Sequence, residues 1–171
     1  MPNISFEVLI NYFEDLADKH VDIKSHYRWN ISEIAEAMRS GVEYPVMAID
    51  SPEVSTSGDR SSRFHYNSMA FTILAKPENI RGADKYAEQN EVLNECLQIG
   101  YDVENRIVAD SAQRERNGEK NWLYNLLDLS SFNFQKVGPI YTDGLYGYRC
   151  EFLIKNAVPK VVDASKWNDL N

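Results

Sequence analysis

A long alternating stretch near the C-terminus constrains the fold of this chain more than any other feature. After Gly144, successive side chains fall into two sets of opposite parity. The apolar and aromatic set is Tyr146, Tyr148, Cys150, Phe152 and Ile154, and the mixed set is Leu145, Gly147, Arg149, Glu151, Leu153 and Lys155. Because neighbouring side chains of a strand point to opposite faces, this pattern predicts a long strand with one face in the core and the other only partly exposed.

The residues just before this stretch predict its partner. The segment SFNFQKVGPIYT, residues 131–142, places Phe132, Phe134 and Val137 on one side. Asp143-Gly144 separates the two apolar runs, and Asp-Gly is a strong signal for a tight turn between strands. The two runs are therefore predicted to form a closing β-hairpin.

Two further strands are expected earlier in the chain. In EYPVMAID, residues 43–50, Pro45 indicates an edge position or the beginning of a strand. FHYNSMAFTILAK, residues 64–76, is apolar on both parities toward its end, which favours a central or doubly covered strand. Between them, residues 51–63 are rich in Ser, Thr and Gly and predict an extended loop.

Apolar spacing predicts three helices. The first spans residues 4–18 with Asn3 as its N-cap, and the second runs from Asn30 to Ser40 with a capping box. A long third helix covers residues 83–114, where Gly100 either bends it or allows close packing. Its expected apolar stripe is Tyr86, Leu93, Leu97, Gly100, Ile107 and Ala112.

Adjacent strands in this order are joined by turns rather than by helical crossovers. This favours an α+β fold: an antiparallel β-sheet with helices packed on one face, a long central helix and a closing β-hairpin. The length of 171 residues suits one domain, 1–171, with an extended loop at 51–63 and a C-terminal arm at 156–171.

Charge and composition narrow the function classes. The net charge is −8 and the sequence pI about 4.9, so the general surface is unsuited to holding DNA phosphates, although DNA could slide past it. Simple solubility is the more ordinary explanation of the acidity. No apolar run is long enough to span a membrane, and the acidic N-terminal stretch does not fit a signal peptide. The two cysteines, Cys96 and Cys150, fit buried positions in a reducing compartment, with a disulfide left open.

Motifs for catalysis or metal binding do not occur. The sequence contains no GxSxG, HExxH, Walker, GxGxxG or CxxC pattern. His20 and His26 have a spacing that matches no common metal site, and His65 has no nucleophile beside it. We therefore expect no enzyme, no metal and no cofactor. The ten Tyr, seven Phe and three Trp instead favour core packing and protein interfaces.

The succession of elements resembles the tail-terminator and neck-ring (head–tail connector) proteins of tailed bacteriophages. The matching stretches are YPVMAID, FHYNSMAFTILAKPENIRGADKYAEQNEVLNECLQIGYDV and FNFQKVGPIYTDGLYGYRCEFLI. The resemblance implies a non-enzymatic virion protein, made in the host cytoplasm, that forms a homo-oligomeric ring of six or twelve copies. Such a ring contacts the tail tube or other neck and portal proteins, while DNA passes through it without specific binding. The helix at 30–40 and the tail after Val158 depart from the family pattern.

A ring subunit needs two different adhesive faces, which predicts where its contacts lie. The partly exposed parity of the last strand supplies one face, and the loop and arm supply segments that can order on a neighbour. The predicted interface residues are Arg149, Glu151, Leu153, Lys155, Arg60, Arg63 and Trp167. Two alternatives remain: a small non-viral or anti-host α+β protein-binding module, and an enzyme with an unrecognised site around His65.

Overall fold

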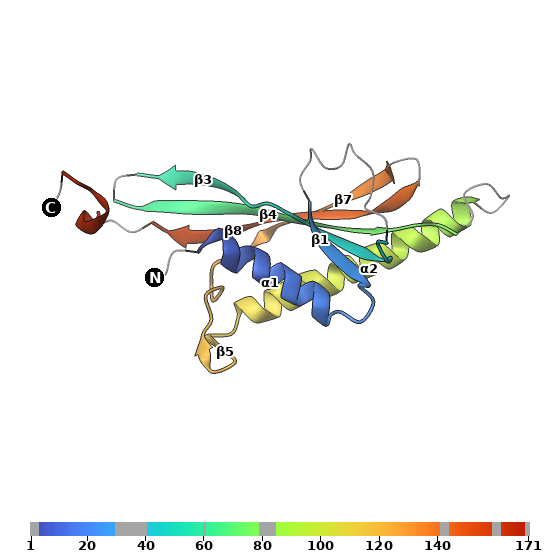
Figure 1. Cartoon of the computed structure of the whole chain (residues 1–171), viewed down its shortest axis with the longest axis horizontal. Helices are drawn as coiled ribbons and strands as arrows, with labels where there is room; N and C mark the ends of the chain where they lie inside the picture. Colours follow the sequence, from blue (N-terminus) through green and yellow to red (C-terminus); the bar gives the residue numbers. More distant parts are fainter. Residues whose placement is uncertain are drawn as a thin grey trace.

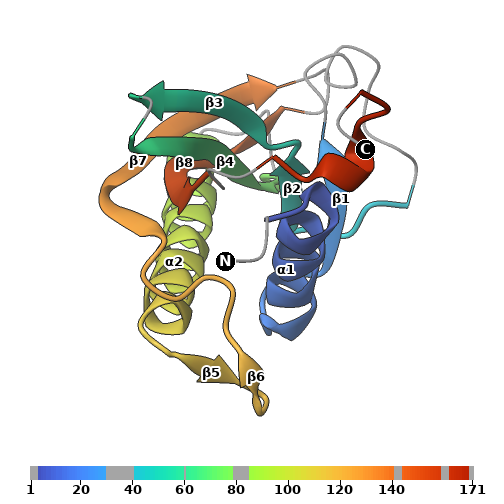
Figure 2. The same cartoon turned by 90° about the vertical axis from the view of Figure 1, so that its left-hand side faces the viewer.

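One mixed sheet, packed against two helices, forms the described part of the chain. The computed structural model describes residues 4–29, 41–59, 61–78, 85–140, 144–158 and 162–169. Its elements are α1 (Phe6–Lys19), β1 (Ser25–Trp29), β2 (Val46–Asp50), β3 (Glu53–Gly58), β4 (Arg63–Ala75), α2 (Lys85–Ser111), β5 (Glu115–Arg116), β6 (Glu119–Lys120), β7 (Leu127–Ile140), β8 (Leu145–Ala157) and the short 3-10 helix η2 (Ala164–Lys166). Both α-helices lie against the same face of the sheet (Figure 1 and Figure 2).

The sheet is antiparallel except at one edge. Its strand order is β1-β2-β4-β8-β7, and β3 also pairs with β4. The strand β1 runs parallel to β2, whereas every other pair in this sheet is antiparallel. The α+β class, the helices on one face, the long helix and the closing hairpin of β7 and β8 are thereby confirmed.

Strand β4 is central, as predicted from its two apolar parities. On one side it pairs with β8 along almost its whole length, from Phe64 opposite Ala157 to Ala75 opposite Tyr146. On the other side β3 pairs with its first half and β2 with its second half. Strand β2 lies between β1 and β4, so Pro45 marks the residue before a strand and not an edge.

The main core lies between the sheet and both helices. The ring of Phe13, on α1, is 6.4 Å from that of Phe71 on β4 and 5.8 Å from that of Phe152 on β8, measured between centroids. On β7, Phe132 stacks on Phe152 at 4.9 Å. The apolar parity of β8 therefore faces the helices, as its alternation predicted, and Cys150 is buried there as a free thiol. Val137, expected on the same side as Phe132, instead packs on a separate cluster of Val46, Ala48, Leu74 and Leu145.

Sequence reasoning misplaced details of both helices. The N-cap of α1 is Ser5, whose hydroxyl accepts a hydrogen bond from the Val8 amide at 3.2 Å, and not Asn3. Tyr86, expected in the buried stripe of α2, is 68% exposed. The buried side of α2 carries Cys96, Ile99, Gly100, Val103 and Ile107. Ala112, at the other end of the expected stripe, is also exposed, whereas Gly100 and Ile107 are buried as predicted. At Gly100 an added Cβ would lie 2.8 Å from the Phe134 ring, so β7 packs closely on α2 there.

Two segments expected to be irregular are strands. The predicted loop 51–63 contains β3, which forms a hairpin with β4. Its turn begins at Asp59, whose carboxylate accepts hydrogen bonds from the Ser61 and Ser62 amides, both at 2.7 Å. Ser and Thr suit an exposed strand as well as a loop, so composition could not distinguish the two. The expected connection through His26 is likewise β1, and the helix predicted at 30–40 lies outside the described residues.

We predict that Gly147→Ala destabilises the fold strongly. A Cβ at this position on β8 would collide with the Ile73 carbonyl oxygen of β4, and neither backbone can move without breaking the central pairing. The free energy of unfolding, measured by urea denaturation, should fall by about 1–3 kcal/mol. Gln135→Ala, at an exposed position of β7, is the control and should change it by no more than about 0.5 kcal/mol.

Candidate functional site

The sheet extends beyond the helices at the end where β4 begins and β8 finishes (Figure 1). Residues 69–75 of β4 are buried, whereas residues 63–66 are exposed or half-buried, and all six residues of β3 are exposed. Exposed apolar side chains gather at this end: Val54 is 60% exposed, Leu129 63% and Trp167 55%. We call Val54, Phe64, Tyr66, Leu129, Lys155 and Trp167 the sheet-end surface.

On the face of the sheet opposite the helices, a cation of this surface lies over two aromatic rings. The Lys155 ammonium lies 4.4 Å from the centroid of Phe64 and 5.3 Å from that of Tyr66. The three residues share the face of the sheet opposite the helices, and Phe64 and Lys155 border a hollow of about 660 Å³ together with Leu129. Rings that carry a cation on an open face are typical of surfaces that bind partners.

The helix side of the same end holds a second hollow, which we call the inner pocket. It has a volume of about 580 Å³ and is lined by Arg114, Lys120, Trp122, Tyr124, Leu126 and Asn156, among others. The guanidinium Nε of Arg114 donates to the Tyr124 hydroxyl at 3.1 Å, and this hydrogen bond lowers the pKa of Tyr124. The pocket thus combines aromatic walls with cationic groups.

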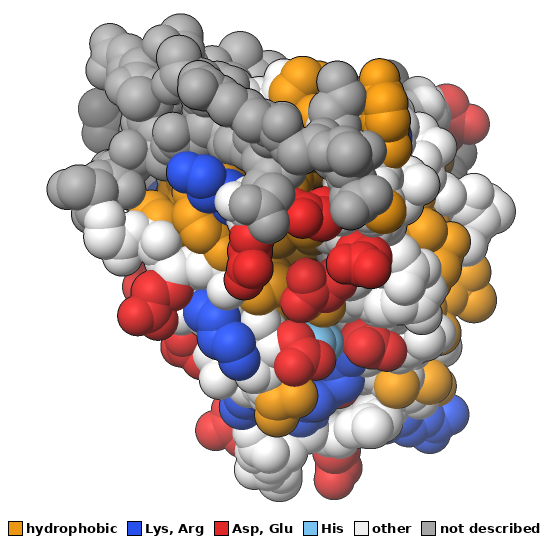
Figure 3. Space-filling view, turned by 90° about the vertical axis from the view of Figure 1, so that its right-hand side faces the viewer, with side chains coloured by type: hydrophobic (Ala, Val, Ile, Leu, Met, Phe, Trp, Pro, Cys, Tyr) orange, Lys and Arg blue, Asp and Glu red, His pale blue; other side chains and the backbone are white. Residues whose placement is uncertain are grey.

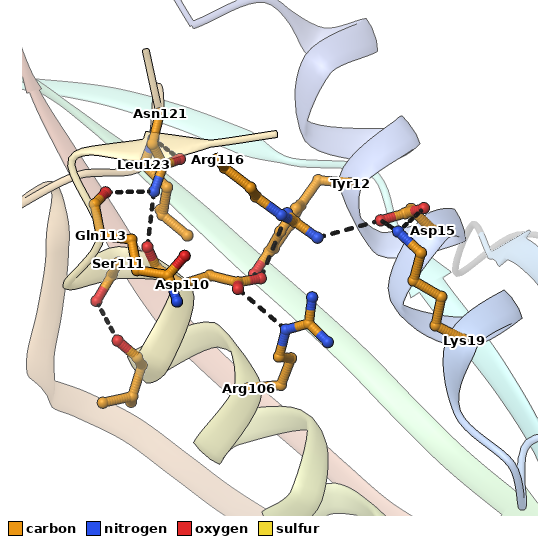
Figure 4. A network of polar contacts seen from close by, with 11 residues as sticks. Tyr12, Asp15, Lys19, Arg106, Asp110, Ser111, Gln113, Arg116, Asn121 and Leu123 are labelled. Atoms are coloured by element: carbon orange, nitrogen blue, oxygen red, sulfur yellow. Dashed lines mark hydrogen bonds and ion pairs between the residues drawn. The ribbon is translucent and has the colours of Figure 1, made fainter. Parts of the chain in front are cut away.

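A buried carboxylate near the inner pocket organises a polar network (Figure 4). Asp110, near the end of α2, is only 3% exposed. Its carboxylate accepts hydrogen bonds from the Tyr12 hydroxyl and from Arg106 Nε, each at 3.0 Å, and pairs with Arg116 at 3.3 Å. Arg116 also reaches Asp15 on α1 at 3.3 Å. This network joins α1, α2 and the β5–β6 hairpin.

The segment after β6 is held by a side-chain cap. Asn121 Nδ2 donates to the carbonyls of Asp110 and Gln113, both at 2.7 Å, and thereby satisfies two acceptors at the C-terminal end of α2. Next to it, Trp122 packs edge-on against Tyr12 with 5.5 Å between centroids. Sequence reasoning missed this network because its members are far apart in the chain, and residues 122–129 gave no clear pattern.

The predicted interface residues are divided between two regions. Arg149 pairs within the chain, at 2.6 Å to Asp50 and 2.9 Å to Glu151, near the middle of the open face. Burial raises the pKa of the Asp50 carboxyl, although Arg149 opposes that effect. Half-buried Leu153 and Lys155 lie nearer the sheet end.

Three other predicted contacts come from the hairpin and the arm. Arg63 is exposed at the start of β4, and Trp167 is exposed directly after η2. The structure therefore brings Leu153, Lys155, Arg63 and Trp167 to the same end of the molecule, while Arg60 lies outside the described residues.

The histidines form no metal site in the part of the chain that the structure describes. His26 contacts Asp18 at 2.9 Å, and His20 lies 3.7 Å from Asp102. No three or more His, Cys, Asp or Glu side chains among the described residues gather as metal ligands. His65 lies opposite Asn156 in the pairing of β4 with β8.

Comparisons with known proteins add no assignment to this geometry. No protein-family model matches the sequence, and a search of curated proteins found no match. Among the described residues, no helix has both the length and the apolar character needed to cross a bilayer.

We predict that Tyr12→Phe lowers the free energy of unfolding at neutral pH. We also predict that in this variant the free energy of unfolding falls less as the pH rises above 10. Burial, followed by the neighbouring Asp110, raises the pKa of Tyr12 far above its ordinary value of 10.0. Above pH 10 the unfolded chain ionises this phenol while the folded chain keeps it protonated, so folding stability falls as pH rises. Near pH 7 the free energy of unfolding of the variant should be about 2 kcal/mol lower, because the Asp110 carboxylate loses the Tyr12 hydroxyl as a hydrogen-bond donor.

Urea unfolding at several pH values measures this. The stability difference between the two proteins should narrow by roughly 1 kcal/mol between pH 10 and 11. Tyr101→Phe, at a 40% exposed position, is the control and should change neither the stability at pH 7 nor its dependence on pH. A difference that stays constant with pH would show that the buried phenol is not coupled to folding.

Proposed function

We propose that this chain is a structural subunit of a ring at the neck or tail end of a tailed phage, acting as a tail terminator or head–tail connector. The observation that carries the proposal is the sheet-end surface, where strands that reach past the helices expose Val54 and Leu129, and where the arm exposes Trp167 directly after η2. Exposed apolar groups in contiguous surfaces mark protein interaction sites. Neighbouring protomers in a closed ring bury such groups on every copy.

The opposite end of the molecule has a different chemistry, as a head-to-tail contact requires. Figure 3 shows acidic side chains gathered around the start of α2. Glu78, Glu88, Glu91 and Glu95 border a shallow hollow there together with Lys76. A subunit with one apolar end and one acidic end offers two unlike surfaces, one to a neighbouring copy and one to a different protein of the particle.

The charge of the chain suits a ring through which DNA travels. With a net charge of −8, the subunit repels phosphates in general, so DNA would pass without being retained. In this proposal the protein is not an enzyme and needs no cofactor. Its partners are copies of itself, the tail tube and the neighbouring neck or portal proteins, and its place is the virion.

The same surface supports a second candidate, a small protein-binding module that acts as a monomer or dimer. Sheet-end side chains would then bind an unrelated protein rather than another copy. Solution mass and particle shape separate the two functions, because only the first produces rings.

We predict that the purified chain forms rings of six or twelve copies. Negative-stain electron microscopy should show the rings, and native mass spectrometry should give the number of copies. Leu129→Asp places a charge in the proposed contact and should reduce the assembled fraction at least about tenfold. The matched control is Val21→Asp, at an 82% exposed position outside the sheet-end surface, which should assemble normally. A chain that remains monomeric, alone and with tail-tube protein, would contradict the ring.

A further inference from the structure

We propose that the inner pocket receives the C-terminal arm of a second copy of this chain, with Trp167 as the inserted side chain. This inference adds a specific contact to the proposed ring, and it rests on the proposed function for the identity of the partner. It assigns a donor, residues 162–169, and an acceptor, the pocket lined by Trp122, Tyr124 and Leu126.

The arm presents its indole on a preformed turn. The Asp163 carboxylate accepts hydrogen bonds from the Ser165 amide at 3.1 Å and the Ser165 hydroxyl at 2.7 Å, and the Trp167 amide donates to the Ala164 carbonyl at 3.1 Å. Trp167 follows this turn with 55% of its surface exposed. A large aromatic side chain held on an ordered turn loses little further entropy on binding, which favours it as an anchor.

The pocket matches this anchor in size, lining and charge. A volume of about 580 Å³ lies within the range of sites that enclose a ligand, and its walls offer two aromatic rings and Leu126. The cations Arg114 and Lys120 and the anion Glu115 line it, so the excess charge is positive. The donor segment, residues 162–169, carries the opposite excess, with Asp163 and Asp169 against Lys166, and Lys160 precedes it.

One buried polar group in the pocket also awaits a partner. Asn156 is 6% exposed and lines the pocket, and its Oδ1 accepts from Asn67 Nδ2 at 2.9 Å. Its own Nδ2 has no hydrogen-bond acceptor among the described residues. Buried donors are seldom left unpaired, and a carbonyl or carboxylate of an incoming arm would satisfy this one.

The arm of the same chain points away from this pocket. After β8 the chain continues past the end of the sheet, on the side opposite the β5–β6 hairpin that borders the pocket, in both Figure 1 and Figure 2. The amide of Val158 donates to the Arg63 carbonyl at 3.0 Å and keeps the start of the arm in line with the sheet. Arms that leave one rim of a ring in this way reach the pockets of adjacent copies.

The test mixes two damaged proteins. Trp167→Ala removes the anchor but keeps the pocket, and Tyr124→Ala damages the pocket but keeps the anchor. We expect each variant alone to associate at least about tenfold more weakly than the natural chain, and an equimolar mixture to form one-to-one pairs, measured by native mass spectrometry. Tyr86→Ala, an aromatic truncation at another exposed site, should associate normally. The inference is overturned if Trp167→Ala keeps the oligomeric mass of the natural chain. It is also overturned if the mixture forms no pairs, because an arm that folds onto the pocket of its own chain cannot restore association between the two variants.

A second measurement separates this inference from the ring. A labelled peptide of residues 158–171 is titrated into the Trp167→Ala chain and followed by fluorescence anisotropy. Binding that weakens at least about tenfold with Tyr124→Ala or with Lys120→Glu supports the pocket, even if no ring forms and the proposed function fails. Equal binding to the intact and altered pockets, or equal binding of a peptide whose Trp is replaced by Ala, overturns it. Circular dichroism confirms that each variant is folded.

Discussion

The pairing of β4 with β8 is the contact on which the rest of this structure depends. It joins strands about 80 residues apart in sequence, from Phe64 opposite Ala157 to Ala75 opposite Tyr146. One face of this pair buries Phe71 and Phe152 beneath α1. Local hairpins add β3 onto β4 and β7 onto β8, while β2 pairs with the second half of β4 and carries β1 at the edge. At the end where β4 begins and β8 finishes, the pair extends past both helices, so this end of the sheet remains without a helical layer.

This uncovered end separates the exposed apolar side chains from the paired charges that stabilise the fold. Near α1 and α2, charges are paired and buried, as Asp110 is with Tyr12 and Arg116. Beyond the helices, apolar and aromatic side chains such as Leu129 and Trp167 are exposed. A single chain has no further layer among its described residues to cover them, so association with another molecule is the natural way to remove this surface from water.

The sequence predicted the strands of the core better than the site. Alternation placed Cys150, Phe152 and Ile154 in the core, and the Asp-Gly signal marked the hairpin before β8. Exposed β3 was missed, since its Ser and Thr residues satisfy loop statistics and strand geometry alike. Parallel β1 was missed because its pairing with β2 depends on a partner 21 residues away, from Ser25 opposite Val46 onward. The inner pocket had no local signal at all.

By itself the sequence determined the α+β class, the long helix α2, the central position of β4 and the closing hairpin, because each follows from periodicity and turn chemistry within a short window. Only the tertiary structure decided that Asp110 binds Tyr12 and Arg116, that Arg149 pairs with Asp50, and that Trp122, Tyr124 and Asn156 enclose one hollow. Those contacts join segments distant in the chain. Their positions are fixed by how helices and strands pack, which no local pattern encodes.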